Sequence, residues 1–496
     1  MVFETTCLSI FLAVVIVVLF LFLSRFKRPK PNLPPGPRPW PILGHLPYLL
    51  FTKEEPQFVF ERWARQYGKI MTLELGGQTA VVLNDLDLIK SCYQSETFNG
   101  RPKLSTFEIA FGAGAGIGTG QHLHWREQRR LAVSLLRTIR FGEGVSMAEI
   151  VEQEAGKLLA DLATHNGHPI DLTHILPKAV CNIVCAFVFG KPFEYSDLRY
   201  ILMLWLVYQN FKLAGPSAVV YSSAFLAKLP FGPGKRLVDN LRAFKQFTED
   251  HIFEHQKTFD RNDIRDFIDA YLSKIENKDN LPIDESEIFK HLNLVWCVND
   301  IFGAGTETTA GTLRWAFLYM ILFPEVQGKL QEELDRVVGR SRMPTLTDKQ
   351  NLPYVEATIQ EINRHADIGP LGVAHATTQQ TEILGYTIPK GTLTLANAHL
   401  CHFNEEYFDN PLEFNPDRFV DADGNFIKRE EVIAFSVGKR TCPGEELARM
   451  ELFFFLTHIL HRYKVTIADG SPKPTLMGYT SITRVPHPYQ VQMVER

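Results

Sequence analysis

The sequence has few cysteines and only a small excess of negative charge. Its 496 residues include seven cysteines, too few and too scattered for a framework of disulfide bonds, which predicts a reducing compartment. The formal net charge is −4, whereas a nucleic-acid-binding surface would be strongly basic. A composition of 45% hydrophobic and 22% charged residues indicates a globular chain, long enough for one large domain or two to three average ones.

The chain also lacks a nucleotide-binding glycine loop. Five glycines alternate with other residues from Gly112 to Gly120, but this spacing never gives G-x-G-x-x-G and does not join a predicted strand to a helix. We interpret the segment as a flexible loop. No flavin or nicotinamide motif is present elsewhere, so a redox reaction would need electrons from a separate protein.

One long hydrophobic run is present, at the N-terminus. Residues 7–23 are almost wholly apolar, and four lysine or arginine residues follow by position 30. In a cleaved signal peptide the charges would come first, so residues 1–30 are predicted to form a signal anchor whose basic end stays in the cytosol. A run of about 17 residues is short for a span, which suits the thin bilayer of the endoplasmic reticulum. Prolines in residues 31–50 predict a stiff elbow before one large domain over residues 51–496.

Hydrophobic periodicity predicts that this domain is mainly α-helical with a minor β region. Two short alternating segments, Lys69–Leu75 and Thr79–Leu83, are joined at Gly76-Gly77 and predict a β-hairpin. The clearest helical patterns run over Glu287–Leu322, Val355–His365 and Glu445–Arg462.

Cys442 comes just before the last of these helices. With Pro443 as the first helical residue, free backbone N–H groups and the positive end of the helix dipole would face the sulfur and favour a thiolate. A thiolate in a tight turn is a metal ligand or a nucleophile. The alternative is a buried structural thiol, which is the usual state of a free cysteine.

The residues around Cys442 suit a large flat ligand. Gly438 and Gly444 keep side chains off both flanks, Phe435 can pack beside the sulfur, and Arg440 can reach an anionic edge of the ligand. The pattern F-x-x-G-x-R-x-C-x-G resembles the haem-thiolate signature of the cytochrome P-450 monooxygenases. The resemblance implies that Cys442 holds the iron of haem b (iron protoporphyrin IX) and that the other residues contact the cofactor.

A second motif lies in the helix predicted over Glu287–Leu322. Two glycines weaken this helix by about 1 kcal/mol each relative to alanine, and a widened groove beside the backbone would offset that cost. Glu307 and Thr308 offer a carboxyl and a hydroxyl group for proton delivery, unless the threonine only bonds back to a carbonyl of its own helix. The sequence AGTETT from Ala304 resembles the family's oxygen-activation motif, which implies that Ala304 contacts the cofactor and that Glu307 and Thr308 are catalytic.

The resemblance also implies residues that bind the haem propionates. Trp125 and Arg129 are one helical turn apart, so an indole N–H and a guanidinium can bind one carboxylate, although a solvated helix face is an equal alternative. The family uses this pair on a propionate, and Arg101 and His375 match further contacts to the cofactor. By itself His375 would be interpreted as an ordinary core histidine.

Glu361 and Arg364 lie three residues apart on one predicted helix face. Exposed pairs of this kind contribute only a few tenths of a kcal/mol. This pair resembles the family's E-x-x-R motif, and Arg418 matches its second arginine. The resemblance implies a buried structural network that holds the Cys442 loop.

The motifs occur in family order along the whole chain, and the animal microsomal branch, which oxidises drugs, steroids and fatty acids, is the most similar. The resemblance implies a membrane-bound monooxygenase that inserts one atom of O₂ into a lipophilic small molecule. NADPH-cytochrome P-450 reductase would deliver the electrons, with cytochrome b5 as a second candidate partner. Three alternatives stay open: a steroid-specific hydroxylase in which Asn210 binds a keto group, a haem-thiolate isomerase or dehydratase, and a non-catalytic haem sensor.

Several weaker features acquire a meaning from the resemblance. The apolar segment Tyr200–Phe231 implies a hydrophobic loop that dips into the membrane, and the glycine-rich loop would lie over the substrate cavity. Basic residues near the signature could form a docking patch for an acidic redox partner, with scattered surface charge as the alternative. These residues are Arg126, Arg130, Arg137, Arg140 and Lys439.

Overall fold

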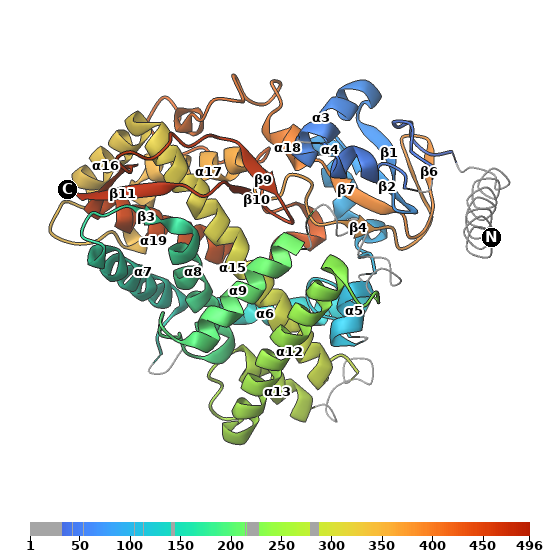
Figure 1. Cartoon of the computed structure of the whole chain (residues 1–496), viewed down its shortest axis with the longest axis horizontal. Coiled ribbons are helices and arrows are strands. Elements are labelled where there is room, and N and C mark those ends of the chain that lie inside the picture. The colour runs from blue at the N-terminus through green and yellow to red at the C-terminus, as the bar shows by residue number, and fades with distance from the viewer. Residues whose placement is uncertain are drawn as a thin grey trace, which may run out of the picture. The chain divides into compact units, whose positions relative to one another are not determined.

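The structure, a computed structural model, divides into two compact units, which are Met1–Pro102 with Val373–Ala396 and Lys103–Gly372 with Asn397–Arg496 (Figure 1). The predicted anchor and most of the segment 214–227 lie outside the described residues. The described residues are 32–41, 43–52, 54–103, 105–112, 114–139, 144–213, 215, 228–277 and 287–496.

The first unit is built on a four-stranded sheet in the order β1-β2-β7-β4. Strands β1 (Ile70–Leu75) and β2 (Gln78–Leu83) are antiparallel, which confirms the predicted hairpin. Strand β7 (Leu393–Ala396) runs parallel to β2, and β4 (His375–Ala376) pairs antiparallel with β7. The other elements are α2 (Leu46–Leu50), α3 (Pro56–Tyr67), α4 (Leu86–Gln94), η1 (Glu96–Phe98) and the β5 (Thr381–Ile383) and β6 (Tyr386–Ile388) hairpin.

The second unit is mainly helical, as the periodicity predicted. Its first helices are α5 (Ser105–Phe111), α6 (His122–Thr138), α7 (Met147–Thr164), α8 (Leu172–Phe189), α9 (Leu198–Leu213), α12 (Gly232–Thr258) and α13 (Phe267–Glu276). The later ones are α15 (His291–Leu322), α16 (Pro324–Val337), η3 (Leu346–Asn351), α17 (Pro353–Ala366), α18 (Ala398–His402), η4 (Pro416–Phe419), η5 (Gly438–Arg440) and α19 (Glu445–Arg462). Its strands are β3 (Ile170–Asp171), β8 (Tyr463–Ile467) and β11 (Gln490–Glu495) in one sheet and β9 (Gly478–Thr480) and β10 (Arg484–Pro486) in another.

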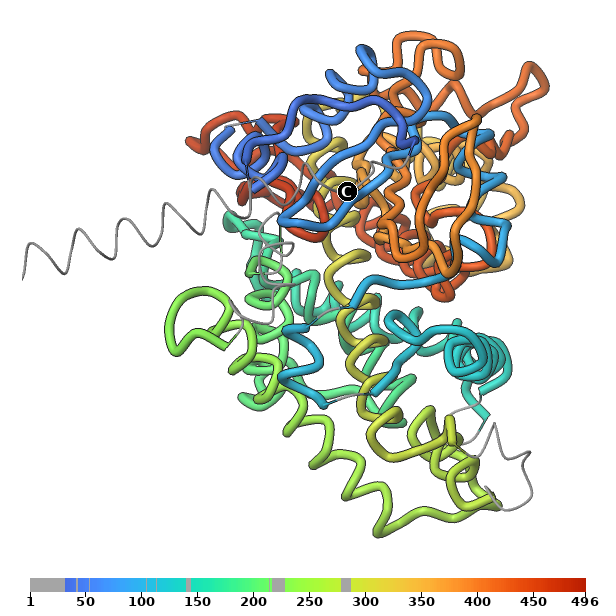
Figure 2. Tube along the Cα trace, turned by 90° about the vertical axis from the view of Figure 1, so that its right-hand side faces the viewer, coloured from blue at the N-terminus to red at the C-terminus, as the bar shows by residue number. Residues whose placement is uncertain are grey.

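Helix α15 is the centre of the second unit. It contacts α8, α9, α12, α17 and α19, and Figure 2 shows it in yellow running through this unit. Its last two turns, residues 315–322, are apolar on all sides, and Trp315, Phe317 and Tyr319 are fully buried. A helix that is hydrophobic all round belongs in a core, so the sequence of α15 places it there. Its bounds agree with the predicted helix, except that it begins four residues later.

Helix α8 is the one described helix that is long and apolar enough to cross a membrane. Most of its residues are buried, as expected of a core helix of this unit. Cys181 and Cys185 belong to this buried set, and no disulfide bond joins any of the six described cysteines. The prediction that the cysteines form no disulfide framework is therefore confirmed for the part of the chain that the structure describes.

The alternating glycines pack against α15. A Cβ atom on Gly114 would lie 2.4 Å from the Trp296 indole, and one on Gly116 would lie 2.0 Å from an oxygen of Asp300. The N–H of Gly118 donates to Asp300 Oδ2 at 2.8 Å. The predicted flexible loop is therefore anchored to the helix through its backbone, and glycine is needed because no side chain fits at the contact.

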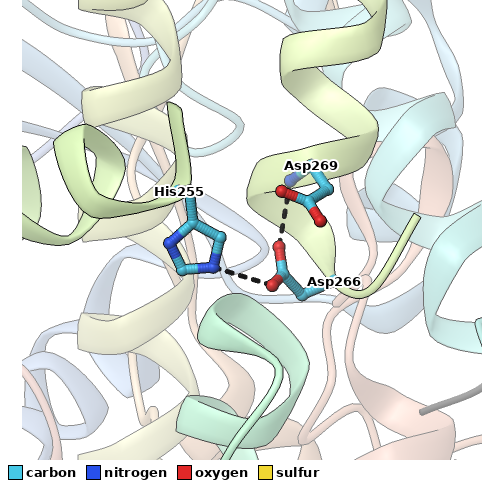
Figure 3. Close-up of side chains that lie close together, drawn as sticks. All are labelled: His255, Asp266 and Asp269. Carbon is cyan, nitrogen blue, oxygen red and sulfur yellow. Dashed lines mark hydrogen bonds and ion pairs between the residues drawn. The ribbon is translucent and has the colours of Figure 1, made fainter. Parts of the chain in front are cut away.

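His255, Asp266 and Asp269 lie close enough together to hold a metal ion at the junction of α12 and α13 (Figure 3). Their polar atoms are already paired. His255 Nε2 lies 2.8 Å from Asp266 Oδ2, while Asp266 Oδ1 accepts from the Asp269 N–H and caps α13. Both oxygens of Asp269 accept from Arg265, so the cluster is interpreted as a helix-joining network.

Asp266→Ala is expected to lower the free energy of unfolding by about 2 kcal/mol, because an N-cap and a buried ion-pair partner are lost together. Burial acts against a charged His255, but Asp266 outweighs it and raises the His255 pKa. At a pH below the ordinary histidine pKa, the ion pair of His255 and Asp266 therefore contributes its full stabilisation. This contribution is lost as the pH rises through the raised pKa of His255 in the folded protein.

Asp266→Asn is the matched control, since asparagine keeps the cap and removes the charge. Denaturant unfolding should show that the difference between wild type and Asp266→Asn is larger in mild acid than at alkaline pH. A difference that does not change with pH, or a loss of stability on adding a chelator, would contradict the interpretation.

Candidate active site

Cys442 lies between η5 and α19. Helix α19 has the predicted bounds, but Gly444 is its N-cap residue, so Pro443 precedes the helix and the expectation that it opens the helix is wrong. The sulfur is hydrogen-bonded by the Gly444 N–H, and the N–H of Cys442 donates to Phe435 O at 2.9 Å. Burial raises the pKa of the thiol, and the bond from Gly444 only partly opposes this. The helix terminus alone therefore does not produce a thiolate, and a cation bound to the sulfur would be needed to hold one.

Helix α6 brings two predicted residues to this loop. The Arg440 guanidinium stacks over the Trp125 ring at 4.0 Å and donates to Gly120 O at 2.6 Å. Arg129 donates to the hydroxyl of Thr441 at 3.2 Å. Burial lowers the pKa of Arg129, and the nearby Cys442 sulfur acts in the opposite direction. The structure therefore gathers two guanidinium groups and an indole at the Cys442 loop, and their contact with haem propionates stays a prediction.

The middle of α15 has an open place in an otherwise buried stretch. Phe302 and Thr306 are buried, whereas Ala304 between them is exposed. The hydroxyl of Thr308 donates to Ala304 O at 2.6 Å. The predicted alternative for Thr308, a bond back to its own helix, is thus present, and it leaves the oxygen lone pairs of Thr308 able to accept a hydrogen bond.

Glu307 is a buried carboxyl with only 7% of its surface exposed. Burial raises its pKa to about 7, although the charge of Arg314 acts in the opposite direction. A group with a pKa near neutrality is present as both acid and base at working pH, which suits a residue that transfers protons.

Arg101 and His375 belong to the first unit, where they lie on adjacent segments. Arg101 Nη1 donates to Ala374 O at 2.9 Å, and His375 Nδ1 lies 2.8 Å from Phe98 O. The His375 ring stacks on Tyr93 with centroids 3.9 Å apart. The structure thus brings these two predicted residues together, and their contact with the cofactor stays a prediction.

Glu361, Arg364 and Arg418 form one buried network. Arg364 donates to both oxygens of Glu361, at 2.6 and 2.8 Å, and neither side chain has exposed surface. Arg418 Nε lies 3.3 Å from Glu361 Oε1, and the Asn415 N–H donates to the same oxygen at 2.7 Å. The remaining donors of Arg364 bind backbone carbonyls, among them that of His402 at 2.8 Å.

A chain of hydrogen bonds leads from this network to the Cys442 loop. The His402 ring accepts from the Ile433 N–H at 3.1 Å, and Ile433 O accepts from the Ser436 N–H at 2.8 Å. The next residue back along the chain, Phe435, accepts the Cys442 N–H. The predicted role of the network as a support for the loop therefore has a physical path, and it stays a prediction until tested.

Sequence reasoning missed the residue that holds this path in place. Asp367 is buried, and its two oxygens lie 2.7 Å from His399 Nδ1 and 2.9 Å from His402 Nδ1. Burial acts to raise the pKa of Asp367, but the two imidazoles outweigh it and hold the pKa well below its usual range. The only signal in the sequence is the spacing of the two histidines, which places them on one face of α18.

Two arginines of the predicted basic patch form ion pairs within the chain. Arg130 lies 2.8 Å from Glu127, and Arg137 donates to both oxygens of Glu446. Arg140 lies outside the described residues. The docking role of the patch stays a prediction.

The donor set fits an iron porphyrin. The half-buried Cys442 can ligate iron through its sulfur, and Trp125 and Arg129 of α6 together with Arg440 of η5 can bind propionates. Gly444 leaves open space beside the sulfur, since the atom nearest to a Cβ placed there would be Cys442 Sγ at 4.0 Å. Residues 434–438 of the loop are only half-buried, and Ala304 is exposed on α15, which packs against α19. Open apolar surface and a set of anion-binding groups together match a flat ligand with an acidic edge.

A mainly helical fold with this combination of cysteine, arginine and tryptophan side chains defines a haem-thiolate protein. The chain matches cytochrome P450 over residues 34–493 and belongs to that family. Over 499 residues it is 34% identical to cytochrome P450 2U1 of Homo sapiens, covering 95% of this chain and 90% of the relative. It is 35% identical to cytochrome P450 2D3 of Rattus norvegicus, covering 97% of each, and 36% identical to cytochrome P450 2F2 of Mus musculus, covering 94% of each.

Family membership confirms several predictions made from the sequence. The protein is a cytochrome P450 monooxygenase, an oxidoreductase that binds haem through a cysteine thiolate, and its similarity to the animal branch is confirmed. The mainly helical fold with a minor β region is confirmed as well.

Pro443→Leu is expected to raise the Fe(III)/Fe(II) potential. Pro443 has no N–H, so at this position the loop offers the sulfur no amide beside that of Gly444. A leucine N–H could donate a second hydrogen bond, draw electron density from the thiolate and favour the reduced iron. Spectroelectrochemical titration of both holoproteins measures the shift, and an unchanged potential would contradict the argument.

Proposed function

We propose that Cys442 is the iron ligand of a monooxygenase that inserts one atom of O₂ into a lipophilic small molecule. The observation that carries the proposal is the placement of Cys442 beside Arg129 and Arg440, with Trp125 under the second arginine. Phe435 and Gly444 would flank the cofactor at the sulfur, and Ala304 would contact it from α15. Arg101 and His375 would complete the set of propionate ligands.

Bound haem supplies one-electron redox chemistry and the activation of dioxygen. The chain supplies a thiolate, fixes the orientation of the cofactor through its propionates and delivers protons. Glu307 would be the proton donor and Thr308 the hydroxyl that orients the proton path. Support for this assignment comes from the pKa of about 7 and from the bond between Thr308 and Ala304 O, which fixes the hydroxyl.

Glu307→Gln is expected to reduce the yield of product per NADPH by roughly tenfold or more, because general acid catalysis is lost. The release of peroxide should increase. In the wild type the yield should fall as the pH rises through about 7, since burial places the pKa of Glu307 there and only the acid donates. The pH dependence should disappear in Glu307→Gln.

NADPH consumption, peroxide and product are measured together between mild acid and alkaline pH. Thr308→Ala is the control, because it leaves the carboxyl in place and should keep the midpoint while lowering the yield. If the product yield of Glu307→Gln still changes with pH around the same midpoint, the titrating group is not Glu307.

The electrons would come from NADPH-cytochrome P-450 reductase, with cytochrome b5 as a second donor, because no flavin or nicotinamide motif is present in the chain. We place the protein on the cytosolic face of the endoplasmic reticulum membrane, with an anchor in residues 1–30, an elbow in residues 31–50 and the catalytic domain in residues 51–496. Support comes from the order of the apolar run and the basic flank in the sequence.

An exposed apolar stripe on α9 supports membrane contact near the predicted hydrophobic loop. Leu198, Leu202 and Trp205 are 80%, 56% and 50% exposed, and Phe231 at the start of α12 is 70% exposed. The spacing of the first three residues puts them on one face of the helix. Large exposed apolar side chains of this kind fit a lipid surface, and lipophilic substrate would enter from there.

The proposal is tested by reconstituting the full-length holoprotein with reductase and NADPH. Lipids, steroids and aromatic xenobiotics are supplied in turn, and product formation coupled to NADPH oxidation is followed. Coupled incorporation of one oxygen atom from labelled O₂ supports the proposal. Turnover that requires neither O₂ nor reductase would instead indicate the isomerase or dehydratase alternative.

A further inference from the structure

Arg314 is a buried arginine in the second half of α15, with 3% of its surface exposed. Its guanidinium donates to a neutral group, Pro486 O, at 2.7 Å, and its Nε has no hydrogen-bond partner among the described residues. A buried cation is costly unless a negative charge compensates it. The position of the nearest suitable carboxyl group on the same helix therefore matters.

Glu307 supplies that carboxyl group on the same face of α15. It precedes Arg314 by seven residues, which is two turns of helix, and Gly311 lies between them on this face. A Cβ atom placed on Gly311 would lie 2.9 Å from Val485 Cγ1 and 3.1 Å from Ile368 Cδ1. Apolar atoms therefore occupy the space beside the glycine, and no side chain of α15 separates the two groups. Charges attract each other much more strongly in such surroundings than in water.

The strands that cover this face bring one further titratable group close to Glu307. Strand β10 packs against α15 and presents Val485, which pairs with Tyr479 of β9 (Figure 1). Tyr479 responds to the charges of both Glu307 and Arg314, and its hydroxyl is hydrogen-bonded to Tyr208 of α9. Burial and this hydrogen bond raise the pKa of Tyr479 to about 12, so the tyrosine is neutral near pH 7.

The charged groups on neighbouring segments have partners of their own. Asp300, two turns earlier on α15, accepts a backbone N–H of the glycine-rich loop at 2.8 Å. Glu451 of α19 is hydrogen-bonded to Thr309, which points from a different face of α15. At the end of α17, Arg364 is paired with a carboxylate and Asp367 with two histidines. The charge that acts on the proton donor is therefore that of the arginine two turns later.

We propose that Arg314 is a positioning residue for proton delivery, and that its charge stabilises the carboxylate that Glu307 becomes when it gives up its proton. The proposal rests on the proposed function, in which Glu307 is the proton donor. The proton leaves along the path oriented by Thr308, and the electron pair of the broken O–H bond stays on the carboxylate. Burial alone would make Glu307 a very weak acid. A cation two turns away offsets part of this effect, so the group can both hold a proton and release it.

The test follows the protonation of Glu307 in the resting holoprotein, without turnover. The infrared C=O band of the protonated carboxyl, identified by its absence from Glu307→Gln, is titrated with pH. Arg314→Gln removes the charge and keeps a donor for Pro486 O. Its midpoint is expected to lie roughly one pH unit or more above that of the wild type, because a nearby opposite charge lowers the pKa of a carboxyl group. The pH midpoint of product yield per NADPH should move in the same direction.

Two further variants separate the charge from the packing. Arg314→Lys keeps the positive charge and should leave the midpoint at the wild-type value. Arg484→Gln is the matched control for removal of a buried arginine beside α15. Arg484 of β10 lies over the Trp315 ring at 4.4 Å, and Trp315 points from a different face of the helix than Arg314, so the midpoint should not change. The carbon monoxide spectrum shows for each variant whether haem is bound as in the wild type.

A midpoint that stays unchanged in Arg314→Gln would overturn the inference. If that variant does not bind haem, Arg314→Lys decides the question, since the wild-type midpoint in it supports a role of the charge and an upward shift contradicts one. If the wild type shows no band that titrates near pH 7 and is lost in Glu307→Gln, the proton-donor role of Glu307 in the proposed function is contradicted as well. The two failures can therefore be told apart.

Discussion

Cys442→Ser is expected to abolish monooxygenase activity and to remove the long-wavelength Soret band that a thiolate-ligated haem gives with carbon monoxide. A serine hydroxyl is a poor ligand for haem iron and does not donate electron density as a thiolate does. The loss should be complete, because none of the neighbouring residues described here offers a second sulfur. The measurement is the reduced carbon monoxide spectrum of full-length protein together with its haem content.

Cys92→Ser is the control for this experiment. Cys92 is a free cysteine of the first unit and is buried, with 6% of its surface exposed. Its replacement should keep the Soret band and most of the activity. A thiolate spectrum that persists in Cys442→Ser would remove the assignment of the iron ligand and the proposal built on it.

Glu361→Gln is expected to give a protein that does not hold haem and whose free energy of unfolding is lowered by about 3–5 kcal/mol. The reason is that Arg364 is fully buried, so loss of the carboxylate leaves its charge without a partner inside the protein. In glutamine one of the two oxygens becomes an NH₂ group, so Arg364, Arg418 and the Asn415 N–H are left with a single neutral acceptor. Haem content and denaturant unfolding are measured on the same preparation.

Glu54→Gln provides a matched comparison, because it makes the same chemical change in an exposed pair. Glu54 lies 2.9 Å from Arg62, and the two side chains are 48% and 61% exposed. Such a pair contributes about 0–1 kcal/mol. Equal losses for the two variants, or a normal haem spectrum of Glu361→Gln, would show that the buried network does not support the Cys442 loop.

The features that the sequence predicted best depend on neighbours in the chain. The hairpin of β1 and β2 and the bounds of α19 follow from alternation, helical periodicity and turn residues, all of which are local. Glu361 and Arg364 share one turn of α17, so their pairing was predictable. Their burial was not, because it depends on the carbonyls of α18 and of the segment before η4, which are distant in sequence.

The features that the sequence did not reveal arise from tertiary contacts. Asp367 meets His399 and His402 only because α18 packs at the end of α17, and no spacing rule connects residues more than 30 positions apart. The alternating glycines were interpreted as a flexible loop, because nothing local shows that Asp300 would receive an N–H from Gly118.

The route from Arg364 through His402 and Ile433 to the cysteine loop has a consequence for how the protein denatures. When α17 frays on warming, the Cys442 loop loses support, because only a few hydrogen bonds separate the loop from this helix. Cofactor release and melting of that helix should then be a single cooperative event, so that a bleached protein is already a partly unfolded one.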